Sequence, residues 1–290
     1  MKKNNKKLTL FILPALLFYS VFTLAPAIGG FWYSLTNWNG LNKNYDFIGL
    51  KNYAAILKDT DFINSITFTL KFVLIMVVLQ NILSLALAIA IESRNRSKTL
   101  FRTLVFMPNM ISMIIGGFMW MFIFTKALPY IAQQLNNAAL MDISWIGDPF
   151  FSFIAIIIVS LWGGIGYLTI IYLAALQGVD KTLKEAASID GANAWQVFRN
   201  VVIPSIMPAI TIGVFVTLNN SFKVFDVVYS LTGGGPGRST QVIAMNIFAE
   251  AYSLNNRYGY ASAKSMVLFA IIFVITIVQL KLMRKKEIDG

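Results

Sequence analysis

The stretch EAASIDGANAWQVFRNVVIPSIMP covers residues 185–208 and interrupts a chain that is otherwise strongly apolar. It begins polar and rich in alanine, and it returns to apolar residues through two prolines four positions apart. The stretch holds no histidine or cysteine, and neither residue occurs anywhere in the sequence. The chain therefore lacks the usual neutral-pH base and any thiolate metal ligand. This composition favours contact with another surface over catalysis.

The 290 residues around this stretch have the composition of a membrane protein. Hydrophobic residues make up 57% of the chain and charged residues 13%, whereas a soluble domain carries about 25% charged residues. Five intervals contain no charged residue: 8–42, 72–91, 103–125, 149–179 and 200–222. A bilayer core requires about 20 apolar residues in a helix. Each interval is therefore long enough to hold one membrane-spanning helix.

A sixth apolar interval lies between Lys264 and Lys281 and is shorter. It reaches spanning length if the helix begins near Tyr258 and Lys264 extends its ammonium group to the headgroups. We therefore predict an all-α integral membrane protein with about six transmembrane helices in a single permease domain, residues 1–290. The expected spans are about 8–34, 66–91, 101–125 (with a kink at Pro108), 150–176, 204–222 and 258–282, and a loop over 177–203 joins the fourth to the fifth.

The distribution of positive charge predicts the orientation of these helices. Placing the N-terminus in the cytoplasm puts 15 of the 24 lysines and arginines on the cytoplasmic side, as the positive-inside rule requires. Both termini are then cytoplasmic. The net charge of +11 flanks hydrophobic runs, so we expect lipid contacts and no nucleic-acid partner. A cleaved signal peptide is the alternative for the first span, but its apolar run, 8–25, is longer than the ~7–15 residues of such peptides.

The first half of the 177–203 loop has the signals of a short helix followed by a turn. Thr182 and Glu185 have the spacing of a capping box, which predicts a helix start at Thr182. Asp190-Gly191 predicts a turn, because glycine readily takes the positive φ that ends a helix. Alanines make the helix slim enough for close approach by another surface; they stand at positions 186, 187, 192 and 194.

The second half of the loop predicts another helix. Trp195, Phe198 and Val202 fall on one face at helical spacing. Pro204 stands where the fifth span is expected to begin, a position that needs no backbone donor. An ordinary amphipathic loop lying on the membrane surface is the alternative interpretation of the whole 177–203 segment.

The fixed positions of the loop form a composite of E-A-A, D-G-A, an aromatic residue and P-x-x-x-P. This composite resembles the EAA loop of permease subunits in bacterial binding-protein-dependent ABC importers. The resemblance implies a type I importer-like fold in which the loop is a coupling helix that docks into a cytoplasmic ATPase. By resemblance, the ATPase contact comprises Glu185, Ala186, Ala187, Asp190, Gly191 and Ala192, supported by Phe198, Pro204 and Pro208. Many relatives have a proline before E-A-A; Asp180 stands near that place here and can cap the helix instead.

The resemblance also implies a set of partners and a location. We expect a second permease subunit forming a hetero-dimer, two cytoplasmic ATPase subunits, and an extracellular or periplasmic solute-binding protein. ATP and Mg²⁺ would bind to the ATPase, so this chain needs no cofactor or metal and is not an enzyme. The expected location is the bacterial cell membrane.

A second segment, FDVVYSLTGGGP at residues 225–236, bears on the substrate. It resembles a segment common in the carbohydrate branch of these permeases, the maltose and glycerol-phosphate permease-like family. The resemblance implies a sugar, an oligosaccharide or a sugar phosphate as substrate. The adjoining glycine-rich run is not a phosphate loop, because Arg238 replaces the required lysine, the glycine spacing differs and no strand precedes it.

Polar and aromatic residues inside the spans are candidates for the substrate pathway, because a sugar needs hydrogen-bonding groups and aromatic faces. These candidates are Gln80, Asn81, Asn109, Trp162, Tyr167, Asn219, Asn220 and Phe222. For each of them taken singly, an interhelical hydrogen bond or a packing role is the favoured interpretation.

Other classes of membrane protein remain as alternatives. A secondary transporter would bury ionisable residues within its spans, and the five uncharged intervals contain none. A membrane scaffold would not need the 185–208 composite, and a membrane-embedded enzyme would have to work without histidine or cysteine. The sequence therefore favours an ATP-driven importer in which this chain forms half of the pathway.

Overall fold

The computed structural model describes residues 5–94, 97–254 and 256–284, and within these ranges the chain is almost entirely helical. The only β pairing there is an isolated bridge between Thr36 and Phe47. Five helices are long and apolar enough to cross a membrane, and a sixth span arises if one bent helix pair is counted as a single crossing. The predicted all-α fold class with about six spans is thereby confirmed.

The chain divides into two compact units. The first comprises residues 1–62 and 246–271, and the second comprises residues 63–245 and 272–290. Two long helices, α4 (Thr60–Glu92) and α16 (Tyr258–Arg284), contribute to both units.

The first unit is built around an apolar N-terminal rod and most of α16. The rod is continuous through α1 (Asn5–Tyr19), a π-helical turn (Ser20–Leu24) and α2 (Ala25–Ser34). The unit also holds α3 (Lys51–Ile56), part of α15 (Ile243–Phe248) and a second π-helical turn (Ala249–Leu254). Asn52 fastens α3 to the end of α2, because its side-chain amide donates to the carbonyl oxygens of Ser34 and Thr36, both at 2.9 Å.

Lys264, in this unit, does not reach toward headgroups as the sequence suggested. Its side chain is 1% exposed, and its Nζ lies 2.9 Å from Asp59 Oδ2 and 2.8 Å from both Glu250 Oε2 and Asn246 Oδ1. It also lies over the ring of Tyr260, 4.6 Å from the centroid. The snorkelling prediction was wrong because the fold supplies three oxygen acceptors for the three donors of the ammonium group.

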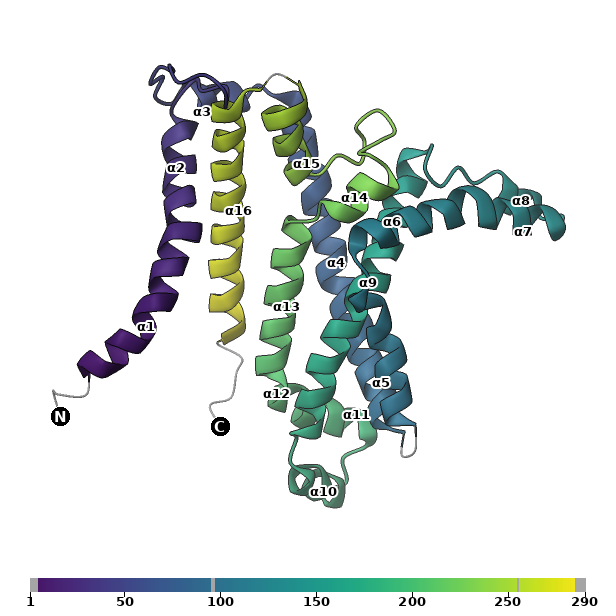
Figure 1. Cartoon of the computed structure of the whole chain (residues 1–290). Helices are drawn as coiled ribbons and strands as arrows, with labels where there is room; N and C mark the ends of the chain where they lie inside the picture. The colour runs from purple at the N-terminus through teal and green to yellow at the C-terminus, as the bar shows by residue number, and fades with distance from the viewer. Residues whose placement is uncertain (1–4, 95–96, 255, 285–290) are drawn as a thin grey trace. The chain divides into compact units, whose positions relative to one another are not determined.

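The second unit contains long helices joined by short ones, as Figure 1 shows. In addition to most of α4, its elements are α5 (Lys98–Phe106), α6 (Met113–Phe122), α7 (Leu128–Gln134), α8 (Ala138–Met141), α9 (Pro149–Gln177), α10 (Lys181–Ile189), α11 (Ala194–Val197), α12 (Ile203–Ser205), α13 (Met207–Phe222) and α14 (Asp226–Leu231). Helix α9 packs against α5, α6, α13 and α14. It is therefore the central helix of this unit.

The third predicted span, 101–125, differs most from the structure. A 3₁₀ turn (Met107–Met110) follows α5, and the backbone is extended at Ser112 before α6 begins. The apolar helical path then continues to Gln134 through a π-helical turn (Ile123–Ala127). Pro108 accounts for the break, because proline lacks an N–H donor and its ring clashes with the preceding helical turn. The sequence indicated a kink at Pro108, but the structure contains two separate helices there.

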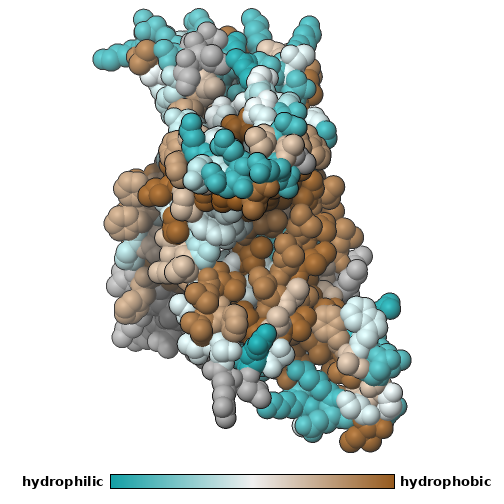
Figure 2. Space-filling model, turned by 90° about the vertical axis from the view of Figure 1, so that its right-hand side faces the viewer, coloured by the Kyte–Doolittle hydropathy of each residue, from teal (hydrophilic) through white to brown (hydrophobic). Residues whose placement is uncertain are grey.

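Close packing in the second unit depends on small residues in α9. Gly166 faces the backbone of α5, where a Cβ atom would overlap with the carbonyl oxygen of Val105. The resulting approach of α5 to α9 resembles the small-residue contacts of membrane helices. Figure 2 shows hydrophobic residues over much of one flank, with hydrophilic residues at the lower end, the end at which α10 lies in Figure 1.

Candidate functional site

The 177–203 loop begins with α10, a short exposed helix capped by Asp180. The Oδ1 atom of Asp180 accepts a hydrogen bond from the backbone N–H of Thr182 at 2.8 Å. The predicted capping box at Thr182 was wrong, because Asp180 is in a non-helical conformation and the helix already includes Lys181. Hydrogen bonds from the backbone and side chain of Thr182 lower the pKa of Asp180 below its ordinary value.

The predicted turn at Asp190-Gly191 is present, with Gly191 at φ +85°. Its N–H donates to the carbonyl oxygen of Ser188 at 3.1 Å, which ends α10. The next helix starts with a true capping box: Asn193 Oδ1 accepts from the Gln196 N–H, and Gln196 Oε1 accepts from the Asn193 N–H. Both ends of the turn are therefore locally determined.

The second helix of the loop extends beyond the predicted start of the fifth span. It runs from α11 through a π-helical turn (Phe198–Val202) into α12, and it contains Pro204. The chain then bends by 69° at Ile206, and α13 begins at Met207. Pro208, near the first position of α13, occupies the place expected for Pro204. Both prolines suit a helix start, so the sequence alone did not distinguish them.

The proposed coupling residues differ in exposure. Glu185, Ala186, Asp190, Gly191 and Pro208 are exposed, while Ala187, Ala192, Phe198 and Pro204 are partly buried. Two apolar residues of α10 that the sequence analysis did not single out are also exposed: Leu183 at 53% and Ile189 at 86%. Singly exposed apolar residues are common on protein surfaces, so the sequence alone gave no specific signal for these two.

A buried apolar cluster anchors the base of the loop. Val179 precedes α10, Val202 lies near the end of the loop, and Ile206 follows the loop. All three are buried. They pack with residues of α4 and α9, with Phe198 against the edge of the cluster. The members from α4 and α9 are Ala88, Ile91, Leu168, Tyr172, Leu173 and Leu176. The loop is therefore in direct contact with two of the long helices, α4 and α9, and a displacement of the loop would act on both.

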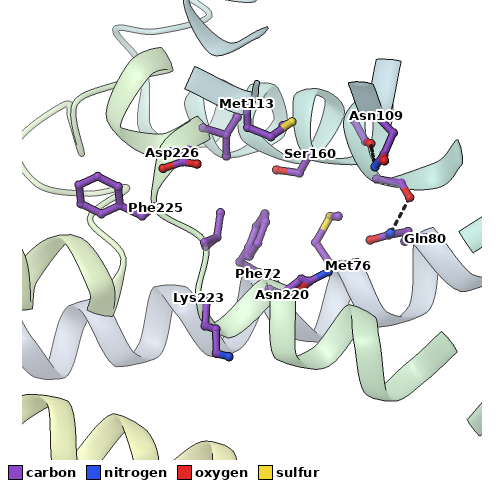
Figure 3. A pocket seen from close by; sticks show the side chains of 15 residues that line it. Phe72, Met76, Gln80, Asn109, Met113, Ser160, Asn220, Lys223, Phe225 and Asp226 are labelled. Atoms are coloured by element: carbon purple, nitrogen blue, oxygen red, sulfur yellow. Dashed lines mark hydrogen bonds between the residues drawn. The ribbon is translucent and has the colours of Figure 1, made fainter. Parts of the chain in front are cut away.

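The second unit also contains a pocket of about 390 Å³, drawn in Figure 3. Ligand pockets usually measure about 300–1,000 Å³ and combine apolar walls with a few polar groups. Residues of α4, α6, α9, α13 and α14, the 3₁₀ turn and the segment between α13 and α14 line it. The lining residues are Phe72, Met76, Gln80, Asn109, Met113, Ser160, Gly163, Gly164, Asn220, Ser221, Lys223, Val224, Phe225, Asp226 and Val227.

Three of the sequence candidates line this pocket. The amide of Gln80 donates to the carbonyl oxygen of Gly164, and that of Asn109 donates to the carbonyl oxygen of Gly163, both at 3.0 Å. These bonds hold the two amides against α9, as Figure 3 shows. Asn220 comes from α13.

The other five candidates do not line the pocket. Asn81 is bonded to Tyr172 and Thr217, and Asn219 donates to a carbonyl oxygen of its own helix. Trp162 packs edge-on against Trp120, at 5.8 Å between ring centroids. Tyr167 is 45% exposed and Phe222 is 1% exposed.

Several lining residues were missed, and helical spacing could have found Ser160, which precedes Gly163 and Gly164 by three and four positions in α9. Residues three and four apart share a helix face. Lys223 and Val224 follow the end of α13 at Phe222, so helical spacing does not reach them. Phe225 and Asp226 lie within the 225–236 segment that the sequence analysis had noted for a different reason, and Figure 3 shows both beside the pocket.

The fold and the two sites define a membrane component of a transport system. Residues 80–287 match the family "Binding-protein-dependent transport system inner membrane component". This chain belongs to that family. It is a membrane permease subunit and not an enzyme.

Individual relatives match along nearly the whole chain. A probable starch degradation products transport system permease protein of Thermoanaerobacterium thermosulfurigenes is 41% identical, covering 99% of this chain and 97% of the relative. A multiple sugar-binding transport system permease protein of Streptococcus mutans is 34% identical, covering 96% of this chain and 95% of the relative. Among solved structures, a bacterial alginate ABC transporter in complex with an alginate pentasaccharide-bound periplasmic protein has a matching chain, with a TM-score of 0.85 and 21% identity over 99% of this chain and 97% of that one. This last likeness concerns the fold.

Proposed function

We propose that this chain forms half of a translocation pathway for a carbohydrate and that its 177–203 loop docks onto a cytoplasmic ATPase. The observation that carries the proposal is α10, an exposed helix with E-A-A on it, anchored by a buried cluster to the helices that hold the pocket. The loop thus has an exposed surface on α10, and its buried base packs against α4 and α9.

The pocket supports a carbohydrate as the substrate. Its lining includes three residues with side-chain amides, Gln80, Asn109 and Asn220, together with Ser160 and Phe225. Hydrogen-bonding groups within apolar walls suit a polyhydroxylated ligand. The printed names of two relatives, which refer to starch degradation products and to multiple sugars, point the same way.

The proposed assembly follows from the family. It contains a second permease subunit, two ATPase subunits that bind ATP and Mg²⁺, and a solute-binding protein outside the membrane. The surplus of basic residues near the expected cytoplasmic segments supports a cytoplasmic position for both termini and the coupling loop. A secondary transporter or a scaffold without ATPase coupling is the competing proposal.

Uptake in vesicles tests the proposal. The tagged chain is purified with its co-purifying subunits, reconstituted into vesicles, and supplied with radiolabelled maltotriose, with glycerol 3-phosphate and glutamate as comparison solutes. We expect maltotriose accumulation only with ATP and the binding protein. Uptake that needs no ATP would support a secondary transporter, and purification of the chain without any ATPase would contradict the coupling role.

Asn220 is expected to contribute directly to sugar uptake. Its side chain is exposed, lines the pocket, and has no hydrogen-bond partner among the described residues. Asn220→Leu keeps the approximate volume and removes the amide. We expect maltotriose uptake to fall about tenfold, since loss of one hydrogen bond to substrate costs ~1.4 kcal/mol.

The control for this variant is Ser205→Ala, which removes a polar group whose hydroxyl bonds only to its own helix, at Val201. Recovery of the assembled subunits is measured in parallel. Unchanged uptake by Asn220→Leu would show that the pocket is not on the substrate pathway.

A further inference from the structure

A three-helix hydrogen-bond junction lies between the base of the coupling loop and the pocket. The Tyr172 hydroxyl of α9 donates to Asn81 Oδ1 of α4 at 2.5 Å. The Asn81 amide nitrogen donates to the carbonyl oxygen of Val77 at 2.7 Å and to Thr217 Oγ1 of α13 at 3.3 Å. The side chains of Tyr172 and Thr217 are each 1% exposed. This junction connects three helices through polar groups in an otherwise apolar interior.

The approach of α13 to this junction requires a glycine. A Cβ atom on Gly213 would overlap with the Tyr172 hydroxyl and would lie 3.0 Å from Asn81 Oδ1. Gly213 stands four residues before Thr217, so both face Tyr172 from the same side of α13. The fit between these two residues and Tyr172 is therefore close enough for α13 to respond when Tyr172 moves.

The junction is in contact with both functional regions. On one side, Tyr172 belongs to the buried cluster that contains Val202 of the loop and Ile206, which follows the loop. On the other side, Gln80 is adjacent to Asn81 and lines the pocket, and Asn220 follows Thr217 by three residues and lines it too. No other described side-chain hydrogen bond joins α4, α9 and α13 at one point.

We propose that Tyr172 is a positioning residue that transmits displacement of the coupling loop to the pocket helices through Asn81, Thr217 and Gly213. It touches neither substrate nor ATPase. A buried polar group is costly to leave without a partner, so α4, α9 and α13 keep their mutual register when the loop shifts. The inference rests on the proposed coupling role of the loop and adds the route by which its movement reaches the pocket.

The test measures maltotriose transported per ATP hydrolysed by the reconstituted assembly. Tyr172→Phe removes only the hydroxyl, and we expect the ratio to fall about tenfold, within the usual range of coupling between two sites. ATP hydrolysis itself should continue. The matched control is Thr169→Val on the same helix: it is also buried, but its hydroxyl bonds only within α9, to Ile165, and its ratio should not change.

A double variant separates coupling from stability. Replacing both partners of a buried hydrogen bond by apolar groups is often nearly neutral for folding. Adding Asn81→Leu to Tyr172→Phe should therefore recover much of the melting temperature of the assembly, less the cost of the bond that Thr217 Oγ1 loses at the same time. Under the proposal the transport ratio stays low in the double variant. Recovery of the ratio together with stability would show a merely structural role and overturn the inference.

The two proposals fail in different ways. If the wild-type assembly shows no ATP-dependent maltotriose uptake, both the proposed function and this inference are contradicted. If the wild type couples transport to ATP and Tyr172→Phe does so with the same ratio, only the inference is overturned. Gly213→Ala, which presses on Tyr172 from α13, should reproduce the lowered ratio of Tyr172→Phe, and a normal ratio would count against the junction.

Discussion

Replacing Gly191 by proline is expected to abolish recovery of the ATPase with this chain. Gly191 has φ +85° and donates its N–H to the carbonyl oxygen of Ser188. Proline is fixed near φ −65° and has no N–H. The turn between α10 and α11 then takes another path, and the E-A-A surface is no longer presented with the same orientation. Proline at a position whose native φ it cannot adopt and whose N–H was hydrogen-bonded destabilises the native conformation by more than ~1 kcal/mol.

The measurement is the amount of ATPase that co-purifies with the tagged chain in mild detergent, set against the second permease subunit as an internal reference. Gly191→Asn is the matched control, because asparagine tolerates positive φ and no atom lies within 4 Å of a Cβ at this position. We expect Asn to retain the ATPase and Pro to lose it while the second permease is kept. Equal ATPase recovery from both variants would mean that the loop is an ordinary surface segment.

Lys264→Met is expected to lower the free energy of unfolding more than other single changes in the first unit. The substitution keeps most of the apolar stem but removes the charge that three acceptors surround. Arg257 still pairs with Glu250 through Oε1 at 2.7 Å, so Asp59 loses the most. Removing one partner of a buried ion pair costs ~3–5 kcal/mol. Reversible unfolding in mixed micelles at neutral pH would measure the loss.

The protonation state of Asp59 determines the pH at which the unfolding of Lys264→Met is measured. Burial alone would raise the pKa of Asp59, but hydrogen bonds from Lys264, the Phe62 backbone and Tyr260 outweigh it and lower the pKa below its ordinary value. Because the pKa of Asp59 is lower in the folded than in the unfolded chain, ionised Asp59 stabilises the fold at any pH above its unfolded pKa. That stabilisation is lost as the pH falls through its folded pKa. At neutral pH the contribution is therefore fully present.

Two further variants complete this prediction. Lys281→Met changes an exposed lysine of the same helix and should leave unfolding nearly unchanged. Adding Asp59→Asn to Lys264→Met removes the orphaned charge, so the double variant should lose less than the sum of the two single changes. Strict additivity, or equal effects of the two lysine variants, would contradict a stabilising role for the buried pair.

The sequence alone was sufficient for the features that depend on local composition. Charge-free intervals of spanning length predicted a helical membrane protein, because a bilayer excludes charge and requires every backbone group to be paired within a helix or closed barrel. Asp190-Gly191 predicted the turn, because positive φ is a local property of glycine. The E-A-A composite placed the chain with the permeases, and the family match over residues 80–287 agrees.

The tertiary structure decided the features that depend on which face of a helix meets a neighbour. Gln80 and Asn81 are adjacent, equally polar and equally suited to a sugar, yet one lines the pocket and the other joins Tyr172 to Thr217. Consecutive residues point about 100° apart on a helix, and only the packing of α9 and α13 determines which direction faces the pocket. Lys264 shows the same dependence on packing: Asp59 lies far away in sequence, and Glu250 and Asn246 lie outside the helix that carries Lys264. Composition alone therefore indicated water and headgroups as its surroundings.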